Sequence, residues 1–514
     1  MTTSERILKN TVFLYVKMGI TVFISLYTTR LVLNALGASD FGIFGVVGGV
    51  ITMLGFLNGA MSSATQRYMS YSQGEGDNER QRYIFNNSLI LHWGIAIVVG
   101  LFLELAALLF FNSILNIEPS RIDAAKWIYH FMVVSTMFTI ISVPYDAAIN
   151  AHENMFYYSI VGILESVLKL VIALYVVYTL YDKLITYGLL MALLSIFLLI
   201  IKQAYCQIKY DECKYRISGY VSKKVIKELT GFAGWNFVST AGTLLGNCGG
   251  NVVVNHYFGT SINAAQNVGS QLRGQMMVFS NNMLKALTPV IVKKEGEGDR
   301  FAMLKFSLTG SKLSFLMFAL LAIPFVVETP FILKVWLKNV PDWTICFSRF
   351  QMVIALMEQL TITLGTTIAA TGKIKEISIF SGFARFVPLI IYVFVFSFGG
   401  EPYWLYIIIL INFGFILNGY TIYQCKKHCN LSMRMFCNSV LYPCCFCSVL
   451  SLIIGSIPVV LMEESWMRFI ISSCMTLSSY LLAIYYVGFN GEEKIIINSL
   501  LRKIFKGMFY KLTC

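Results

Sequence analysis

The amino-acid sequence predicts an all-α, polytopic membrane protein with about 14 transmembrane helices. Three observations predict this fold: the composition, the length of the apolar runs and an internal repeat. The chain of 514 residues is 57% hydrophobic and only 13% charged, whereas soluble globular proteins carry about 25% charged residues. Because so few charges cannot cover a surface that faces water, we expect the chain to lie in a membrane.

The apolar runs give the predicted helices in order. They span roughly residues 10–35, 41–66, 84–111, 122–149, 155–180, 184–206, 229–256, 262–290, 301–327, 344–371, 374–398, 402–424, 437–461 and 466–488. Each run is about 20 residues or longer, which is the length of a membrane-crossing helix, whereas barrel strands alternate in polarity over about ten residues. Backbone polar groups in lipid must pair within their own segment, so each run is predicted to be helical.

An internal repeat relates the two halves of the chain. Residues 37–77 align without a gap to residues 259–299, and both copies end in Gly-Glu-Gly-Asp. Nine of the 41 aligned positions are identical. Each copy follows an odd-numbered helix and runs inward through the next helix, so the two copies have the same orientation. They form a parallel repeat, as in several transporter folds.

The repeat sets the predicted domain organisation. Helices 1–6 form an N-terminal six-helix lobe over residues 1–206, and helices 7–12 form a C-terminal six-helix lobe over residues 229–430. Residues 207–228 are a basic cytoplasmic linker, and residues 431–514 add two further helices and a basic cytoplasmic tail.

Loop charges predict the orientation. With the N-terminus in the cytoplasm, the inner segments hold 26 Lys and Arg residues and the outer segments hold 7, which agrees with the positive-inside rule. Both termini are then cytoplasmic. The net charge of +13 therefore reflects topology and attraction to anionic lipid on the inner leaflet, and no nucleic-acid partner is expected.

Charged residues near the middle of the second-lobe helices are candidates for function, because each costs at least about 2.5 kcal/mol to insert. Three are cations, Arg273, Lys312 and Arg385, and one is an anion, Glu358. One interpretation is a cavity in which the cations bind an anionic substrate. The other is that Glu358 forms a structural ion pair with one cation, while the others contact carbonyl groups or snorkel.

Four charged residues lie within the first-lobe helices. Glu165 and Lys169 are four residues apart on one helical face, so they are predicted to form a structural ion pair. Lys17 and Arg30 are both on the first helix but 13 residues apart, and they do not share one face. Both are candidate substrate-binding residues, although Lys17 is close enough to the inner end of the helix to snorkel.

No catalytic, metal or cofactor site is predicted. Cys444, Cys445 and Cys447 cluster within an apolar run, but their spacing does not match that of a zinc site. No nucleophile and base occur together in a recognisable pattern, and the outer loops are too short to hold a catalytic domain. The chain is therefore not expected to be an enzyme.

The N-terminal region carries a family resemblance. Residues 6–10 (Arg-Ile-Leu-Lys-Asn), 29–33 (Thr-Arg-Leu-Val-Leu) and 36–43 (Leu-Gly-Ala-Ser-Asp-Phe-Gly-Ile) resemble the start of bacterial polysaccharide-transporter proteins. These are the flippases of O-antigen and capsule repeat units, within the multidrug/oligosaccharidyl-lipid/polysaccharide exporter superfamily. The superfamily also contains the lipid II flippase and the multidrug and toxin extruders.

The resemblance implies two six-helix lobes around a central cavity lined by helices 1, 2, 7 and 8. It implies alternating-access transport of an undecaprenyl-pyrophosphate-linked oligosaccharide from the inner to the outer leaflet of the bacterial inner membrane. The cargo would be an O-antigen, capsule or exopolysaccharide repeat unit. The expected partners are this anionic substrate and membrane lipid, the expected state is a monomer, and coupling to an ion is left open.

Two alternatives remain open at this point. A multidrug or metabolite extruder of the same superfamily would be expected to bind cations with acidic cavity residues, and the excess of central cations argues against it. A membrane-embedded glycan polymerase or acyltransferase would need a large outer loop or a polar catalytic cluster. Neither feature is visible in the sequence.

Overall fold

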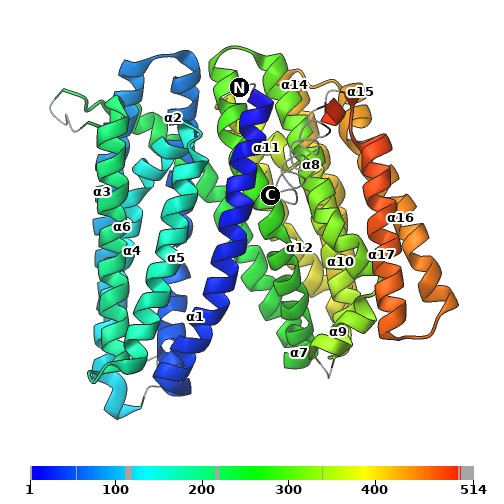
Figure 1. Ribbon diagram of the computed structural model, residues 1–514, viewed down its shortest axis with the longest axis horizontal. Helices are drawn as coiled ribbons and strands as arrows, with labels where there is room; N and C mark the ends of the chain where they lie inside the picture. Colours follow the sequence, from blue (N-terminus) through cyan, green and yellow to red (C-terminus); the bar gives the residue numbers. More distant parts are fainter. Residues whose placement is uncertain are drawn as a thin grey trace, which may run out of the picture. The chain divides into compact units, whose positions relative to one another are not determined.

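The structure is a computed structural model that describes residues 3–53, 55–109, 111, 118–214, 219–337, 340–491, 493–495 and 498. Nearly all of these residues are helical (Figure 1). Eleven helical segments among them are long and apolar enough to cross a membrane. The predicted all-α, polytopic membrane fold is therefore confirmed.

Three of the 14 predicted spans are not among these eleven segments. Residues 41–53 fall in α1 (Thr3–Met53) and residues 55–66 in α2 (Gly55–Glu75), and residues 229–256 and 262–290 fall in α7 (Lys223–Gly296). Glycine and amide side chains are frequent in these stretches. They lower the hydropathy of the two stretches in α7, whereas the stretch at 41–66 is apolar but is divided between two described helices, α1 and α2.

The long helices α1 and α7 each bend at a glycine. Gly37 in α1 has φ 78° and ψ 169°, and Gly259 in α7 has φ 78° and ψ −173°. Glycine is nearly the only residue that adopts this conformation. The two glycines occupy equivalent positions in the repeat, so the repeat found in the sequence corresponds to the same bend in two helices.

The two Gly-Glu-Gly-Asp segments also have matching backbone structure. Gly76 has φ 72° and Gly298 has φ 77°. In each copy the Asp N–H donates to the carbonyl five residues earlier, at 3.3 Å for Asp77 and 3.0 Å for Asp299. A left-handed glycine with this hydrogen bond is a common helix ending, so each copy of the repeat ends in the same turn.

The chain divides into two compact units. The first comprises Leu8–Ala241 and Pro289–Arg300, and the second comprises Met1–Ile7, Gly242–Thr288 and Phe301–Cys514. Helix α7 contributes to both units, so this division does not fall at the predicted linker, residues 207–228. The lobe boundaries inferred from the repeat stay a prediction.

The first unit packs around α4 (Ile122–Ala151), which contacts α2, α3, α5 and α6. Its other elements are α3 (Asn78–Leu109), η2 (Pro119–Arg121), α5 (Met155–Tyr178), α6 (Lys183–Lys209) and η3 (Asp211–Cys213). The core contains large, fully buried side chains, including Phe85, Tyr129 and Tyr145.

The second unit contains the remaining helices. They are α8 (Arg300–Val327), α9 (Thr329–Leu337), α10 (Thr344–Gln359), α11 (Ile362–Ala370), α12 (Lys375–Ser397), α13 (Trp404–Ile409), the π-helix η4 (Leu410–Leu417), α14 (Asn418–Cys429), α15 (Met433–Phe436), the π-helix η5 (Cys437–Leu441), α16 (Tyr442–Leu461), α17 (Trp466–Ala483) and the π-helix η6 (Ile484–Gly488). Helices α16 and α17, which lie outside the repeat, pack side by side (Figure 1).

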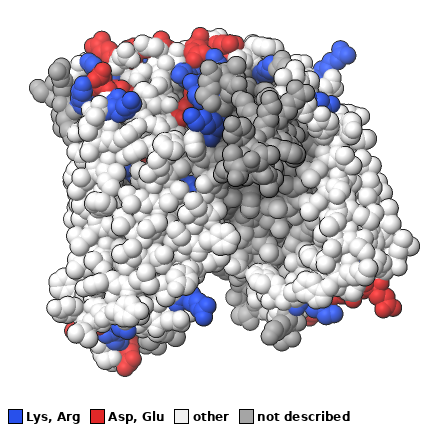
Figure 2. Space-filling model, in the orientation of Figure 1, with Lys and Arg blue, Asp and Glu red and all other residues white. Residues whose placement is uncertain are grey.

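Charged side chains gather near the ends of the helices on the face shown in Figure 2, and the stretches between are almost entirely uncharged. Many of the exposed side chains are large and apolar, such as Phe23, Val98 and Phe394. Such exposure would be unfavourable in water but suits contact with lipid.

Candidate functional site

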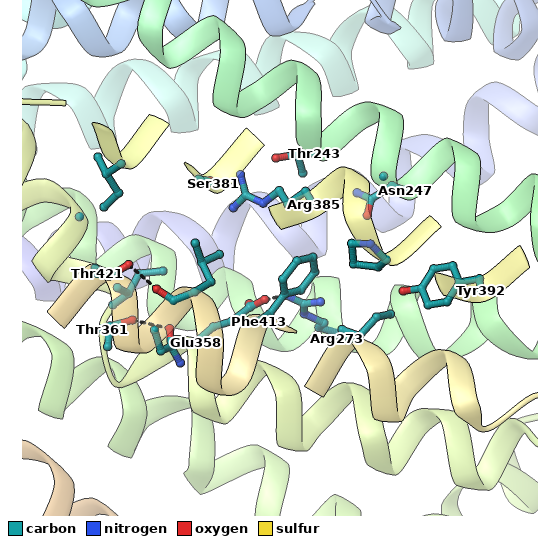
Figure 3. Close-up of a pocket in the computed structure, with 18 residues that line it drawn as sticks. Thr243, Asn247, Arg273, Glu358, Thr361, Ser381, Arg385, Tyr392, Phe413 and Thr421 are labelled. Atoms are coloured by element: carbon teal, nitrogen blue, oxygen red, sulfur yellow. Dashed lines mark hydrogen bonds and ion pairs between the residues drawn. The ribbon is translucent and has the colours of Figure 1, made fainter. Parts of the chain in front are cut away.

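A cavity of about 330 Å³ lies within the second unit, between α7, α10, α11, α12, η4 and α14 (Figure 3). Its polar lining residues are Thr243, Asn247, Arg273, Glu358, Thr361, Ser381, Arg385, Tyr392, Asn418 and Thr421. This volume is at the low end of the range for small-molecule sites, about 300–1,000 Å³. It suits a group the size of a phosphate or pyrophosphate better than a whole oligosaccharide.

Glycines bring α7 and α12 close together at one wall of the cavity. A Cβ at Gly242 would lie 2.7 Å from the backbone of Gly382, and a Cβ at Gly246 would lie 2.6 Å from the carbonyl oxygen of Arg385. Real Cβ atoms do not approach so closely, so these positions require glycine. The close packing of small residues, common between membrane helices, places the backbone of Arg385 directly against α7.

Arg273, on the second half of α7, divides its guanidinium between two acceptors. Its Nη2 forms an ion pair with Glu358 Oε2, and its Nη1 donates to Gln351 Oε1 at 3.3 Å. Gln351 is held in turn, because its Nε2 donates to Ser270 Oγ at 3.2 Å and to the hydroxyl of the buried Tyr406 at 3.3 Å. These contacts orient Arg273, yet the side chains of Arg273 and Glu358 remain 28% and 25% exposed.

Glu358 lies just before a break between two helices. Helix α10 ends at Gln359 and α11 begins at Ile362. Asn418 holds the break, because its Nδ2 donates to the carbonyl of Met357 at 2.8 Å and its Oδ1 accepts from Thr361 Oγ1 at 2.7 Å. Interrupted helices in membranes occur where the freed backbone groups face protein or a wet cavity, and this one places a carboxylate at the cavity wall.

Arg385, on α12, is the second guanidinium in the cavity (Figure 3). Among the described residues that line the cavity, the charged ones are Arg273, Arg385 and Glu358. Their charges sum to one positive charge when all three are ionised. The cavity therefore favours an anion, and its hydroxyl and amide groups supply further hydrogen bonds.

The structure places Lys312 away from this cavity. Its side chain in α8 is buried, and its Nζ lies 2.6 Å from Glu493 Oε2. It lines a different cavity of about 290 Å³, together with residues of η5 and η6. A role for Lys312 in substrate binding stays a prediction.

The two candidates on α1 belong to the first unit. Lys17 is half-buried, with its side chain over Gly162 and its Nζ 4.2 Å from the centre of the Tyr158 ring. Arg30 is exposed. Neither lines the cavity that contains Arg273, and their roles in substrate binding stay predictions.

Two ion pairs lie within the helices of the first unit. Lys169 Nζ is 2.6 Å from Glu165 Oε1, at the predicted four-residue spacing on α5. Lys202 Nζ is 2.8 Å from Asp146 Oδ2, which joins α6 to α4. The sequence analysis did not identify the second pair, because it depends on how two separate helices pack.

The uncharged polar lining of the cavity is not apparent in the sequence. Thr361 and Asn418 hold the helix break, while Thr243, Asn247, Ser381 and Thr421 line the walls. Hydroxyl and amide groups within apolar runs were the available signal. Such side chains are frequent in membrane helices, so only their convergence in three dimensions distinguishes these from the others.

The fold is that of membrane transporters of the MOP superfamily. The chain superposes on a crystal structure of MATE in the straight conformation with a TM-score of 0.69 at 15% identity, covering 83% of this chain and 96% of that one. For an outward-facing multidrug resistance MATE family transporter of the MOP superfamily, the TM-score is 0.68 at 14% identity, with 84% and 96% covered. For a MOP superfamily transporter from Pyrococcus furiosus, it is 0.70 at 13% identity, with 84% and 98% covered.

The sequence places the chain in a family within this fold. Residues 7–295 match the model of the polysaccharide biosynthesis protein family, and the chain belongs to that family. Among curated protein sequences, none matches this chain. The family and the fold agree with the resemblance found in the N-terminal motifs.

Proposed function

We propose that this protein is a flippase that moves an undecaprenyl-pyrophosphate-linked oligosaccharide from the inner to the outer leaflet of the bacterial inner membrane. The observation that carries this proposal is the membrane-embedded cavity with two guanidinium groups and one carboxylate. A guanidinium presents its donors in a planar fork that matches phosphate oxygens. Arg273 and Arg385 would bind the pyrophosphate, and both chain termini would be cytoplasmic.

The size of the cavity agrees with binding of the pyrophosphate end of the substrate. A volume of about 330 Å³ accommodates the phosphate groups and the nearest part of the first sugar. The isoprenoid chain would remain in lipid, because it gains nothing by leaving an apolar solvent. The rest of the oligosaccharide would have to lie outside this cavity.

A reciprocal contact at the ends of α2 and α7, within the first unit, supports alternating access. A Cβ at Gly74 would lie 2.1 Å from the carbonyl oxygen of Lys293, and a Cβ at Gly296 would lie 2.2 Å from that of Tyr71. The offset of the repeat relates Gly74 to Gly296 and Tyr71 to Lys293. The two copies thus meet through equivalent backbone surfaces, as expected for a parallel repeat of the kind found in alternating-access transporters.

The rival function is extrusion of drugs or metabolites. The two MATE transporters compared above have the same fold, and Glu358 offers an acidic group inside the cavity. In the Pyrococcus furiosus transporter, a binding pocket of reverse polarity suggests a different function for that protein. Polarity thus differs among transporters of this fold, and the excess of positive charge here favours an anionic substrate.

Deletion of the gene tests the proposal. We expect the cell to lose a surface glycan and to accumulate its lipid-linked precursor on the cytoplasmic leaflet, and a plasmid copy to restore both. Lipid extraction and surface-glycan staining measure these quantities. If the surface glycan is unchanged and sensitivity to cationic drugs rises, the extruder function is correct.

A further inference from the structure

We propose that Glu358 is a built-in counter-ion that the substrate displaces from Arg273, and that this exchange selects a group carrying at least two negative charges. The inference rests on the proposed function in taking that group to be a pyrophosphate ester. It assigns Glu358 a role in substrate selection and release, whereas one of the two interpretations of the sequence made it part of a structural ion pair.

The exposure of the Arg273–Glu358 pair distinguishes it from a structural ion pair in the same unit. Glu328 pairs with Arg468 at 2.9 Å, and these two side chains are 0% and 10% exposed. Arg273 and Glu358 retain 28% and 25% exposure, and both line the cavity. A ligand in the cavity therefore reaches both partners, and a displaced carboxylate has solvent-accessible space to enter.

The position of Glu358 next to the helix break places its side chain at the wall of the cavity. The residue lies in the last turn of α10, and α11 begins only at Ile362. Asn418, the first residue of α14, joins the break to the π-helix η4, because its Nδ2 donates to the carbonyl of Met357 at 2.8 Å and to that of Gly414 at 3.1 Å. Short departures from the regular α-helix of this kind occur often at functional sites.

Charge decides which ligand exchanges with the carboxylate. A group with one negative charge gains little by displacing Glu358, because it replaces one anion by another and leaves the carboxylate nearby. A pyrophosphate ester carries more charge and more oxygen acceptors, and it can contact Arg273 and Arg385 together. Charge-assisted hydrogen bonds to guanidinium are about twice as strong as neutral ones, so the second guanidinium makes the exchange favourable.

The same exchange would also promote release of the substrate from the cavity. A transporter that binds a polyanion with two permanent cations would hold it too tightly to turn over. Glu358 remains beside Arg273 throughout the cycle and competes for the guanidinium. When the cavity opens to the other leaflet, the return of Glu358 favours departure of the substrate.

Binding of small anions to the purified full chain in detergent tests the inference. Calorimetry with inorganic pyrophosphate and with acetate measures binding of a polyanion and a monoanion. We expect the wild type to bind pyrophosphate but not acetate. Glu358→Gln should bind pyrophosphate at least about tenfold tighter, corresponding to about 1.4 kcal/mol, and should bind acetate measurably.

Transport supplies a second readout that a structural role would not give. Glu358→Gln should reduce surface-glycan display at normal membrane abundance although it binds pyrophosphate more tightly, because release is slowed. Glu165→Gln, which alters an ion pair in the first unit, is the matched control and should change neither quantity. Arg385→Gln should weaken pyrophosphate binding with or without Glu358→Gln.

Two results would overturn the inference. One is that folded Glu358→Gln binds pyrophosphate no more tightly than wild type, which makes Glu358 a positioning residue for Arg273. If Glu358→Gln does not fold, Glu358→Asp replaces it. The shorter side chain should hold Arg273 less well, so the variant should bind pyrophosphate severalfold more tightly than wild type. Unchanged or weaker binding of pyrophosphate is the second result that would overturn the inference.

The proposed function can fail separately. If the anion-binding results are as expected but deletion of the gene leaves every surface glycan intact, counter-ion exchange is supported and the flippase function is wrong. If deletion removes a glycan but Glu358→Gln binds pyrophosphate as wild type does, the flippase function is supported and only the counter-ion exchange is wrong.

Discussion

The two copies of the repeat have the same backbone conformation at equivalent glycines but different side chains at the position of Arg273. Gly37 and Gly259 make the same bend, and Gly76 and Gly298 end the copies in the same turn. Yet the position of Arg273 in the second copy is occupied by Ile51 in the first. The repeat thus preserves the hinges and turns, while the arginine that faces the cavity is present in one copy only.

Two ion pairs within the helices of the first unit differ in the same way from the charges that line the cavity of the second unit. In the first unit, Asp146–Lys202 and Glu165–Lys169 are one-to-one pairs. In the cavity of the second unit, Glu358 is the only carboxylate among the described lining residues, whereas two guanidinium groups line the same cavity. We therefore expect anion binding to be concentrated in the second unit, and the predictions below test this expectation from the largest effect to the smallest.

Arg273→Ala should abolish glycan display at normal membrane abundance, because the cavity loses one of its two guanidinium groups. Arg273→Lys keeps the charge but loses the planar fork, so it should only weaken display. Membrane abundance and surface glycan are measured together.

A purely structural role for this pair gives a different pattern. Arg273→Ala and Glu358→Ala would then both lower membrane abundance, and the double variant would restore it. Full glycan display by well-expressed Arg273→Ala would falsify the assignment of the substrate site.

The sequence was sufficient for the fold because the signals for it are local. Apolar runs and the paired Gly-Glu-Gly-Asp segments predicted helices and the repeat, and the repeat aligned residues that prove to have equal backbone conformations. Arg273, Arg385 and Glu358 were also identified as unusual, because a charge within an apolar run is visible without a structure.

The partner of Lys312 was not predictable. Lys312 pairs with Glu493, 181 residues further along the chain, and Glu493 lies beyond the last predicted span. Counting only charges within predicted spans therefore overestimated the excess of cations in the second lobe. The helix break at Thr361 was missed for a similar reason, because Asn418 holds it across 57 residues of sequence.

Gly74→Ala and Gly296→Ala should each reduce glycan display strongly, and to a similar extent. Each added methyl group would overlap a carbonyl oxygen, at 2.1 Å from Lys293 O and 2.2 Å from Tyr71 O. Overpacking of this kind costs typically about 1–3 kcal/mol. The double variant should be little worse than either single variant, because both open the same contact.

Gly59→Ala is the matched control for these variants, since a Cβ there would meet nothing within 4 Å. A cysteine pair at Tyr71 and Lys293 measures the contact directly, as the cross-linked fraction. Unchanged cross-linking in the Gly74→Ala background would contradict a role for glycine in this contact.

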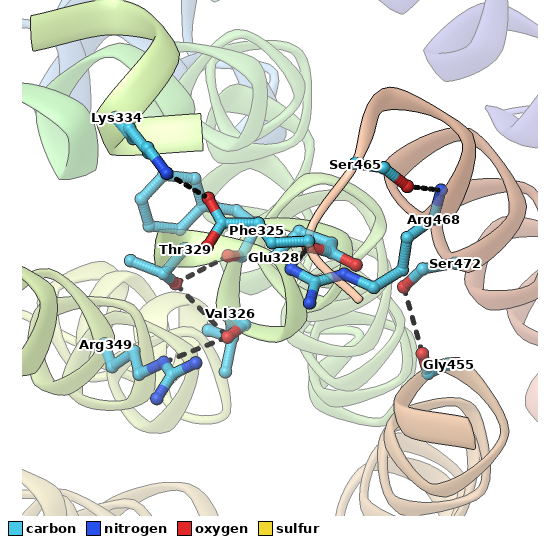
Figure 4. A network of polar contacts seen from close by, with 11 residues as sticks. Phe325, Val326, Glu328, Thr329, Lys334, Arg349, Gly455, Ser465, Arg468 and Ser472 are labelled. Atoms are coloured by element: carbon cyan, nitrogen blue, oxygen red, sulfur yellow. Dashed lines mark hydrogen bonds and ion pairs between the residues drawn. The ribbon is translucent and has the colours of Figure 1, made fainter. Parts of the chain in front are cut away.

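Arg468→Leu should lower thermal stability more than any variant of a half-exposed pair. Arg468 on α17 binds Glu328 at the junction of α8 and α9, and Glu328 is completely buried (Figure 4). Leaving a buried carboxylate without its partner costs about 3–5 kcal/mol. Melting of the detergent-solubilised protein measures the loss.

The double variant Arg468→Leu/Glu328→Leu should recover most of that stability, because an apolar pair needs no desolvation of charge. Recovery would show that the ion pair serves attachment of α17 and not substrate binding. If the double variant is as unstable as the single one, the loss comes from packing around Arg468.

Acid should weaken the first unit through Asp182. Arg121 bridges Asp40 and Asp182, at 2.8 and 2.6 Å. Burial disfavours ionisation of Asp182, but the Arg121 guanidinium and two backbone N–H donors together hold the pKa of this carboxyl below its usual value of 3.8. Its contribution to stability is therefore present above that pH and is lost as the pH falls through the lower folded-state pKa.

Arg121→Gln should lower the melting temperature at neutral pH, by the equivalent of about 1 kcal/mol for a partly exposed pair. The difference between the variant and wild type should shrink as the pH falls below about 4, because protonated Asp182 no longer needs the guanidinium. A difference that stays constant across this range would show that Arg121 acts through packing.

Glu165→Gln and Lys169→Gln should have the smallest effects. The pair joins residues one turn apart on α5, and the two side chains are 39% and 40% exposed, so it contributes about 0.5 kcal/mol or less. Each variant should retain glycan display and pyrophosphate binding, whereas variants of the Arg273–Glu358 pair should change both. Loss of glycan display in Lys169→Gln at normal abundance would show that the first unit also binds substrate. The asymmetry between the two units would then be one of ion pairing alone, and Lys17 and Arg30 would be candidate substrate contacts in the first unit.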